Sequence, residues 1–178
     1  MQKILETERL MLRVFEDDDL DAFAALEADP DVMKYFTSGP RSRERAARGV
    51  AWFKDLQEQY GYSLWAVIDK SDDTFLGYCG LVPQTINGKE EVEVGYKLDK
   101  RYWRRGLATE AAIAVRIWGF SNLRVPRLIS IIDPRNTASI RVAEKNGMRF
   151  TVDVEYDSKV CHVYAIDRLE PGGIVSTS

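Results

Sequence analysis

A short turn rich in arginine and glycine carries the clearest chemical signal in this 178-residue chain. Arg101, Arg104 and Arg105 precede Gly106, and Ala108 follows where apolar residues begin to recur every three or four positions. The first N–H groups of a helix lack intrahelical partners, so they can bind an anion that small residues let approach. Guanidinium groups suit phosphate recognition. The turn therefore predicts an anion site, although spacing alone also fits a helix start with solvated arginines.

Two carboxylates form a candidate proton acceptor. Glu91 and Glu93 alternate with apolar residues, which predicts that their side chains share one face of a strand. One or both could line a cleft and remove a proton through a water, and the alternative is a solvent-facing acidic edge. His162, the single histidine, has a suitable pKa for proton transfer, but its position in a closing strand favours a structural role.

A third group of polar residues surrounds the start of a later helix. Asn136 is a good N-cap for a helix that runs to Lys145, and Asn146 with Gly147 supplies the stop. Ser139 falls in the first turn, where a serine is often only a capping aid.

The elements that must position these residues follow from hydrophobic periodicity and turn signals. We expect one domain over residues 1–170 without repeats, and a disordered tail over 171–178. Helices are predicted at 17–28, 42–59, 136–145 and for about four turns from Leu107. Strands are predicted at 7–15, 64–69, 75–82, 91–98, 127–133, 149–156 and 160–167.

The bulk composition excludes several classes of function. A net charge of -3 and a pI near 5.3 argue against a general nucleic-acid binder. Four arginines at 41, 43, 45 and 48 leave ribosome contact as an alternative to a solvated helix face. Cys79 and Cys161 lie in apolar runs without metal-ligand spacing, so they indicate core residues and no metal. The sequence shows no signal-peptide pattern and no run of about 18 apolar residues. We therefore expect a cytoplasmic protein that does not contact a membrane.

Residues 103–111 resemble the pyrophosphate-binding motif of GNAT acetyltransferases, Gln/Arg-x-x-Gly-x-Gly/Ala. Trp103 stands at the first position, a departure common in the branch of ribosomal-protein N-terminal alanine and serine acetyltransferases. Residues 6–13 and 136–148 resemble the same branch, and the likeness extends roughly from Leu5 to Asp167.

This resemblance implies a mixed α/β fold, the GNAT fold. It has a central, mostly antiparallel, twisted sheet of about seven strands that is splayed at the cofactor cleft, with helices on both faces. Acetyl-CoA would be the co-substrate. The resemblance places the cofactor against the backbone of Tyr96 and Leu98 and in the turn that contains Arg101, Arg104, Arg105, Gly106, Leu107, Ala108 and Thr109, with Asn136 and Ser139 on the far side.

Amide formation requires a neutral amine, a stabilised oxyanion and protonation of the leaving thiolate. The tyrosine that many GNAT enzymes use as the acid is replaced by Ala143, and the resemblance makes Ser139 the substitute. Ile131 occupies the place of the family's glutamate, which leaves Glu93 and Glu91 as candidates for the base. An α-amino acceptor with a pKa of roughly 8 is partly neutral already, so a strong base is unnecessary.

The resemblance implies acetylation of a protein N-terminal amino group as the first choice. Polyamines, amino acids or aminoglycosides are the alternative acceptors, which would need a narrow, closed pocket. A catalytically silent acyl-CoA sensor is a third reading, which the loss of the tyrosine at Ala143 favours. Acceptor choice would depend on the early helices and the closing strands, which offer aromatic residues such as Tyr35 and Phe36, although aromatic residues there are usually core. Exposed edge strands favour a homodimer.

Overall fold

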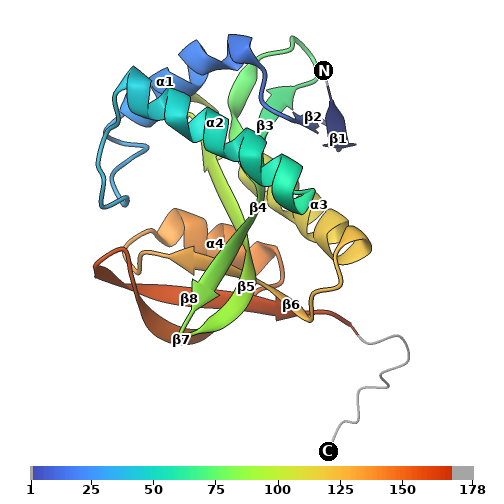
Figure 1. Cartoon of the computed structure of the whole chain (residues 1–178), viewed down its shortest axis with the longest axis vertical. Helices are drawn as coiled ribbons and strands as arrows, with labels where there is room; N and C mark the ends of the chain where they lie inside the picture. The colour runs from blue at the N-terminus through green and yellow to red at the C-terminus, as the bar shows by residue number, and fades with distance from the viewer. Residues whose placement is uncertain (1, 170–178) are drawn as a thin grey trace, which may run out of the picture.

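The computed structural model describes residues 2–169, which form one eight-stranded sheet and four α-helices (Figure 1). The prediction for 171–178 lies outside these residues. The helices are α1 (Leu20–Ala28), α2 (Arg43–Tyr60), α3 (Leu107–Asn122) and α4 (Thr137–Lys145). The strands are β1 (Lys3–Glu6), β2 (Leu10–Arg13), β3 (Leu64–Asp69), β4 (Phe75–Ile86), β5 (Lys89–Leu98), β6 (Arg127–Ile132), β7 (Arg149–Tyr156) and β8 (Lys159–Asp167). Short 3-10 turns cover Asp17–Asp19 and Lys100–Tyr102.

The sheet has the order β1-β2-β3-β4-β5-β6-β8-β7. Every neighbouring pair is antiparallel except β5 and β6, which run parallel and share the single register pair Glu93–Ile129. The two strands therefore separate beyond this point, which confirms the expected splayed, mostly antiparallel sheet. The additional strand is β1, whose four residues are too few for an alternating pattern to be recognised.

Several element boundaries differ from the predictions for local physical reasons. The strand predicted at 7–15 begins only at Leu10, because the Thr7 amide turns back to the Leu10 carbonyl at 2.8 Å. The helix predicted at 17–28 starts as a 3-10 turn. β4 and β5 continue to the tight turn at Asn87 and Gly88, whose φ values of 50° and 75° match the twist of a two-residue hairpin.

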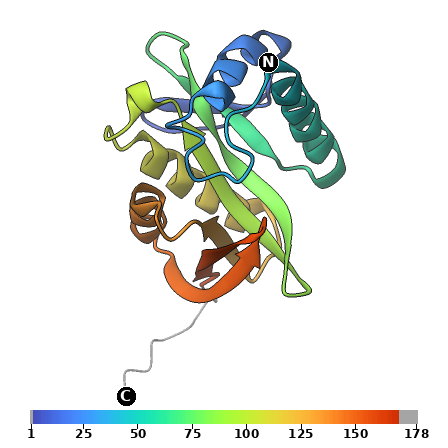
Figure 2. The same cartoon turned by 90° about the vertical axis from the view of Figure 1, so that its left-hand side faces the viewer.

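Helices cover both faces of the sheet, as Figure 2 shows with α1 and α2 on one side and α3 and α4 on the other. Ala111 and Val115 of α3 are fully buried in the core of the second side. On the first side, Phe15, Phe23 and Phe53 pack with ring centroids 5.3 to 5.7 Å apart. Both cysteines are free and buried, which agrees with a core role. None of the helices within residues 2–169 has the length and apolarity needed to cross a membrane.

A buried ion pair joins the end of α1 to the end of β5. Lys97 Nζ lies 2.6 Å from Glu27 Oε1, and the two side chains are 4% and 0% exposed. Arg41 binds the other carboxylate oxygen at 2.9 Å. Burial lowers the pKa of Lys97 to about 8, although the Glu27 carboxylate opposes this shift. The pair fixes the strand that enters the site.

We expect Glu27→Ala to lower the free energy of unfolding by about 3–5 kcal/mol, because it leaves the Lys97 ammonium buried without its partner. Urea denaturation measures the loss. The matched control is Asp21→Ala, since Asp21 is on the same helix as Glu27. This variant removes an exposed ion pair to Arg43 of α2 and should cost about 0.5 kcal/mol. Equal losses in the two variants would contradict the assigned role of the buried pair.

Candidate functional site

A cavity of about 610 Å³ opens where β5 separates from β6. Five segments line it: the connection between α1 and α2, the end of β5, the turn that follows β5, the start of α3, and one side of α4 together with its N-cap. The predicted site residues in its wall are Tyr96, Leu98, Arg104, Gly106, Leu107, Ala108, Thr109, Asn136 and Ser139. The structure therefore brings together two motifs that are far apart in the sequence.

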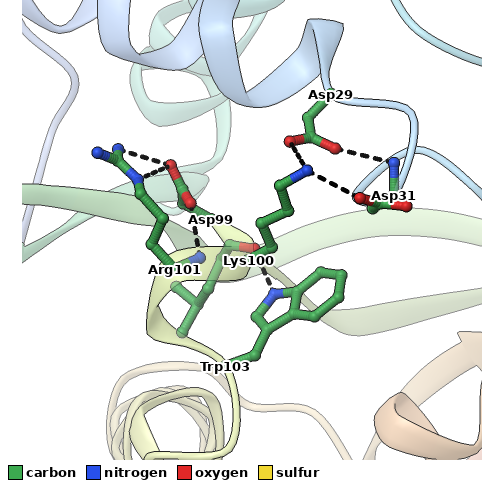
Figure 3. Close-up of polar contacts among 7 residues, drawn as sticks. Asp29, Asp31, Asp99, Lys100, Arg101 and Trp103 are labelled. Carbon is green, nitrogen blue, oxygen red and sulfur yellow. Dashed lines mark hydrogen bonds and ion pairs between the residues drawn. The ribbon is translucent and has the colours of Figure 1, made fainter.

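The backbone at the end of β5 faces this cavity. Asp99 donates its amide to Leu76 of β4 at 2.9 Å. Since backbone groups alternate in direction along a strand, those of Tyr96 and Leu98 point away from β4 and into the gap. Trp103 donates its indole N–H to the Leu98 carbonyl at 2.7 Å, and Figure 3 shows the Trp103 side chain with this bond as a dashed line. This bond holds the turn against β5, while the Leu98 amide and the Tyr96 backbone remain directed toward the cavity.

The start of α3 has the geometry of an anion site. Gly106 is the N-cap with φ 78°, and no side chain caps the helix. The first intrahelical bond runs from the Glu110 amide to the Gly106 carbonyl at 3.0 Å. The amides of Leu107, Ala108 and Thr109 precede this bond, so they have no partner within the helix. These uncapped N–H groups in the cavity wall fit a pyrophosphate.

The N-terminal segment fixes the start of α3 through Glu110. Its carboxylate accepts hydrogen bonds from the Thr7 hydroxyl, from the Arg9 amide at 3.0 Å and from Arg9 Nε at 2.7 Å. Arg9 also donates to the Arg105 carbonyl at 3.0 Å. Burial opposes ionisation of Glu110, yet the bonds from Thr7 and Arg9 hold its pKa below the usual value. This contact gives the 6–13 segment a physical role in the site.

Two of the predicted phosphate ligands lie outside the cavity wall. Arg101 forms an ion pair with Asp99 at 2.7 Å, and Figure 3 shows its guanidinium on that carboxylate. Arg105 is exposed, with its guanidinium 5.7 Å from the Tyr102 ring. Contacts of Arg101 and Arg105 with the cofactor stay predictions.

The far side of the cavity is formed by the first turn of α4. The Asn136 side chain accepts the Ser139 amide at 3.1 Å, so its predicted capping geometry is present. Tyr96 donates its hydroxyl to the Ser139 carbonyl at 2.8 Å and ties α4 to β5 across the gap. Within residues 2–169, no side chain or backbone group binds the Ser139 hydroxyl, which therefore remains available in the cavity wall. Ala143 is fully buried.

Comparison with known proteins decides the family. Residues 9–149 match the family model described as acetyltransferase (GNAT) domain. The chain belongs to the GNAT acetyltransferase family. It is 41% identical over 161 residues to the uncharacterized protein YkkB of Bacillus subtilis, covering 90% of this chain and 93% of the other.

Solved structures have the same fold. A GNAT-family acetyltransferase of Bacillus anthracis is 30% identical over 92% of this chain and 97% of its own, with a TM-score of 0.76. RimL, the ribosomal L7/L12 alpha-N-protein acetyltransferase solved with coenzyme A, has a TM-score of 0.78 at 16% identity, covering 93% and 98%. This GNAT chain is an acetyl-CoA-dependent N-acetyltransferase, and its GNAT homologues bind coenzyme A.

The two carboxylates of the GNAT enzyme's β5 differ sharply in environment. Glu93 is half-buried, and burial raises its pKa to about 7, although hydrogen bonds from Gln84 at 2.6 Å and the Ile131 amide at 3.3 Å oppose the shift. Glu91 instead forms an ion pair with Arg127. The sequence pattern does not distinguish Glu91 from Glu93, because their partners lie in other strands.

The positions of two aromatic residues, the histidine and a lysine relative to the cavity can also be compared with their interpretation from the sequence. Tyr35 and Phe36 line the cavity and Phe36 is 41% exposed, so interpreting them as core was wrong. His162 bonds Asp153 at 2.7 Å and lies outside the cavity wall, which agrees with a structural role. No pattern in the sequence points to Lys97, which is also among the residues that line the cavity.

We expect Gly106→Val to weaken acetyl-CoA binding by at least roughly tenfold, since a β-branched residue is strained at φ 78° and its side chain would crowd the amides. Calorimetric titration measures the dissociation constant. Gly88→Val is the control, because it imposes the same strain at φ 75° in the β4–β5 turn. Undiminished affinity in the Gly106 variant would refute this placement of the pyrophosphate.

Ser139→Ala tests the role of the free hydroxyl. If that hydroxyl protonates or stabilises the leaving thiolate, kcat should fall by about 100-fold while the dissociation constant of acetyl-CoA stays within about twofold. Thr137→Ala, in the same first turn of α4, is the control. A kcat equal to that of the unmodified enzyme would remove Ser139 from the mechanism.

Proposed function

We propose that this enzyme acetylates the α-amino group of a protein N-terminus, with Glu93 as the general base. The observation that carries the proposal is the half-buried Glu93 carboxyl, whose pKa of about 7 suits proton transfer near neutral pH. When bound, acetyl-CoA supplies the activated acyl group. The residues of this chain then have to position the amine, accept its proton and assist the departing sulfur.

Side chains along β5 alternate between the two faces of the sheet, so the acceptor amine and acetyl-CoA would contact side chains of different faces. Glu93 and Lys97 project to the same face, and Lys97 meets Glu27 of α1 there. Tyr96 projects to the opposite face and reaches α4. An amine that approaches from the α1 side would therefore meet the acyl group at the gap, with Glu93 on the same face of β5 but behind the residues that line the cavity.

Matching of pKa values favours an α-amino acceptor over an alkylamine. An α-ammonium group has an ordinary pKa of about 8, which is closer to the raised pKa of Glu93 than the ordinary pKa of about 10.4 of a lysine-like ammonium. Proton removal from the α-amine therefore needs no stronger base than Glu93.

The acid and the backbone groups complete the proposed mechanism. The Leu98 amide points into the gap and is placed to polarise the acyl carbonyl. Ser139 offers a hydroxyl to the leaving sulfur from the opposite wall. The shared fold with RimL, whose name gives an alpha-N-protein acetyltransferase of ribosomal L7/L12, adds support for the acceptor class.

The pH dependence of turnover tests the base. With a peptide acceptor, kcat should rise as pH increases through about 7, because Glu93 accepts a proton only when ionised. Glu93→Gln should lower kcat by about 100-fold and abolish this rise. Glu90→Gln, an exposed carboxyl on the same strand, is the matched control and should keep the profile. An unchanged profile in the Glu93 variant would exclude this base.

Stability provides an independent readout on the same variant. Folding raises the pKa of Glu93 from 4.5 to about 7, so the folded state binds more protons between these pH values and loses stability as pH rises through them. At pH 8 we therefore expect Glu93→Gln to be more stable by about 1–2 kcal/mol. A variant that is both more stable and less active shows a catalytic defect and not misfolding.

Thiol release with an acceptor panel tests the substrate class. Release that depends on N-terminal peptides supports the proposal, whereas release with polyamines or aminoglycosides alone would assign a small-molecule acceptor. Tight acetyl-CoA binding without release from any amine would instead favour an acyl-CoA sensor.

A further inference from the structure

Lys100 joins the turn before α3 to the connection between α1 and α2. It is the first residue of the 3-10 turn Lys100–Tyr102, which connects β5 to α3. Its Nζ lies 2.9 Å from Asp29 Oδ2 and 2.8 Å from Asp31 Oδ2, in the connection between α1 and α2. Figure 3 shows the ammonium group between the two carboxylates. One side chain thus spans two segments that are about 70 residues apart in the sequence.

Asp31 lines the cavity, and Lys100 lies directly before lining residues of the turn between β5 and α3. Residues 31–36, except Met33, line its acceptor side, and Trp103 and Arg104 continue the turn that leads to the uncapped amides of α3. The turn itself is held at two further points, because Asp99 accepts the Arg101 amide at 2.8 Å and Trp103 binds the Leu98 carbonyl. Lys100 therefore projects from a well-fixed support.

The connection between α1 and α2 depends on such contacts, since it contains no helix or strand. Lys97 Nζ holds its middle, at 3.0 Å from the Met33 sulfur and 3.8 Å from the centre of the Phe36 ring. Thr37 donates to the Asp157 carbonyl at 3.1 Å farther along. At the beginning of the connection, Lys100 supplies the contact, and Asp29 is oriented for it by accepting the Asp31 amide at 2.8 Å.

We propose that Lys100 is a positioning residue that couples the two substrate sites. It holds residues 29–36, the acceptor wall, against the turn that precedes the donor site. When bound acetyl-CoA fixes the turn, the ion pairs of Lys100 also fix the acceptor wall. Amine binding is therefore favoured after the donor has bound. Lys100 touches neither reacting group in this account.

Kinetics of Lys100→Ala test the coupling with whichever amine the enzyme turns over best. The KM for the amine should rise by roughly two- to fivefold, the size expected when an exposed ion pair is lost. The kcat and the dissociation constant of acetyl-CoA should stay within about twofold, because the reacting groups are untouched. Lys100→Arg should restore the KM, since it keeps the charge between Asp29 and Asp31.

Lys54→Ala is the matched control for these measurements. Lys54 also forms an exposed ion pair, 2.7 Å from Asp17, but it contacts neither wall of the cavity. Its removal should leave the KM for the amine unchanged. An equal rise in the Lys54 and Lys100 variants, or no rise in either, would overturn the proposal.

Hydrogen–deuterium exchange gives a readout that needs no acceptor, so it stands even if N-terminal peptides prove not to be substrates. In the unmodified enzyme, acetyl-CoA should slow exchange of the amides in residues 29–36. In Lys100→Ala this protection should be reduced, while protection at the start of α3 persists. Equal protection of 29–36 in both proteins would show that acetyl-CoA orders the wall without Lys100.

Discussion

The single register pair between Glu93 of β5 and Ile129 of β6 is the constraint on which the site depends. A sheet normally satisfies the backbone groups of an inner strand on both sides. Here the parallel pair is closed by Ser130, whose hydroxyl binds the Val94 carbonyl at 2.8 Å, and the strands then separate. The end of β5 is left with backbone groups that face a cavity, between the N-termini of α3 and α4. The groups of this cavity that are available to a donor are therefore mainly those of the main chain.

The side chains of β5 have different roles on the two faces of the sheet. Side chains directed to the α1 face supply a carboxyl of raised pKa and a buried ammonium, whereas Tyr96, directed to the other face, ties down α4. Polar groups in such a place are costly to bury unless they are paired, and each is held by a partner from a distant segment. The site is thus stabilised by the contacts that bring the elements of the fold together.

Local patterns in the sequence were sufficient for the parts of the site that are themselves local. The uncapped start of α3 and the Asn136 cap are built from neighbouring residues, so their geometry could be predicted from spacing. The different roles of Glu91 and Glu93 could not, because Arg127 and Gln84 belong to other strands. The contacts of Lys97 and Lys100 were missed for the same reason. Edge strand β1 was missed because four residues carry too little pattern.

The contact of Thr7 and Arg9 with Glu110 has a consequence for the order in which the molecule can assemble. These partners are 103 and 101 residues apart, and chains are synthesised from the N-terminus. The first ten residues leave the ribosome long before the helix they stabilise, so residues 7–9 have to be kept available until Glu110 has been made. The start of α3 is consequently fixed late, and a fragment lacking the first residues would lose contacts that hold a helix near the middle of the chain.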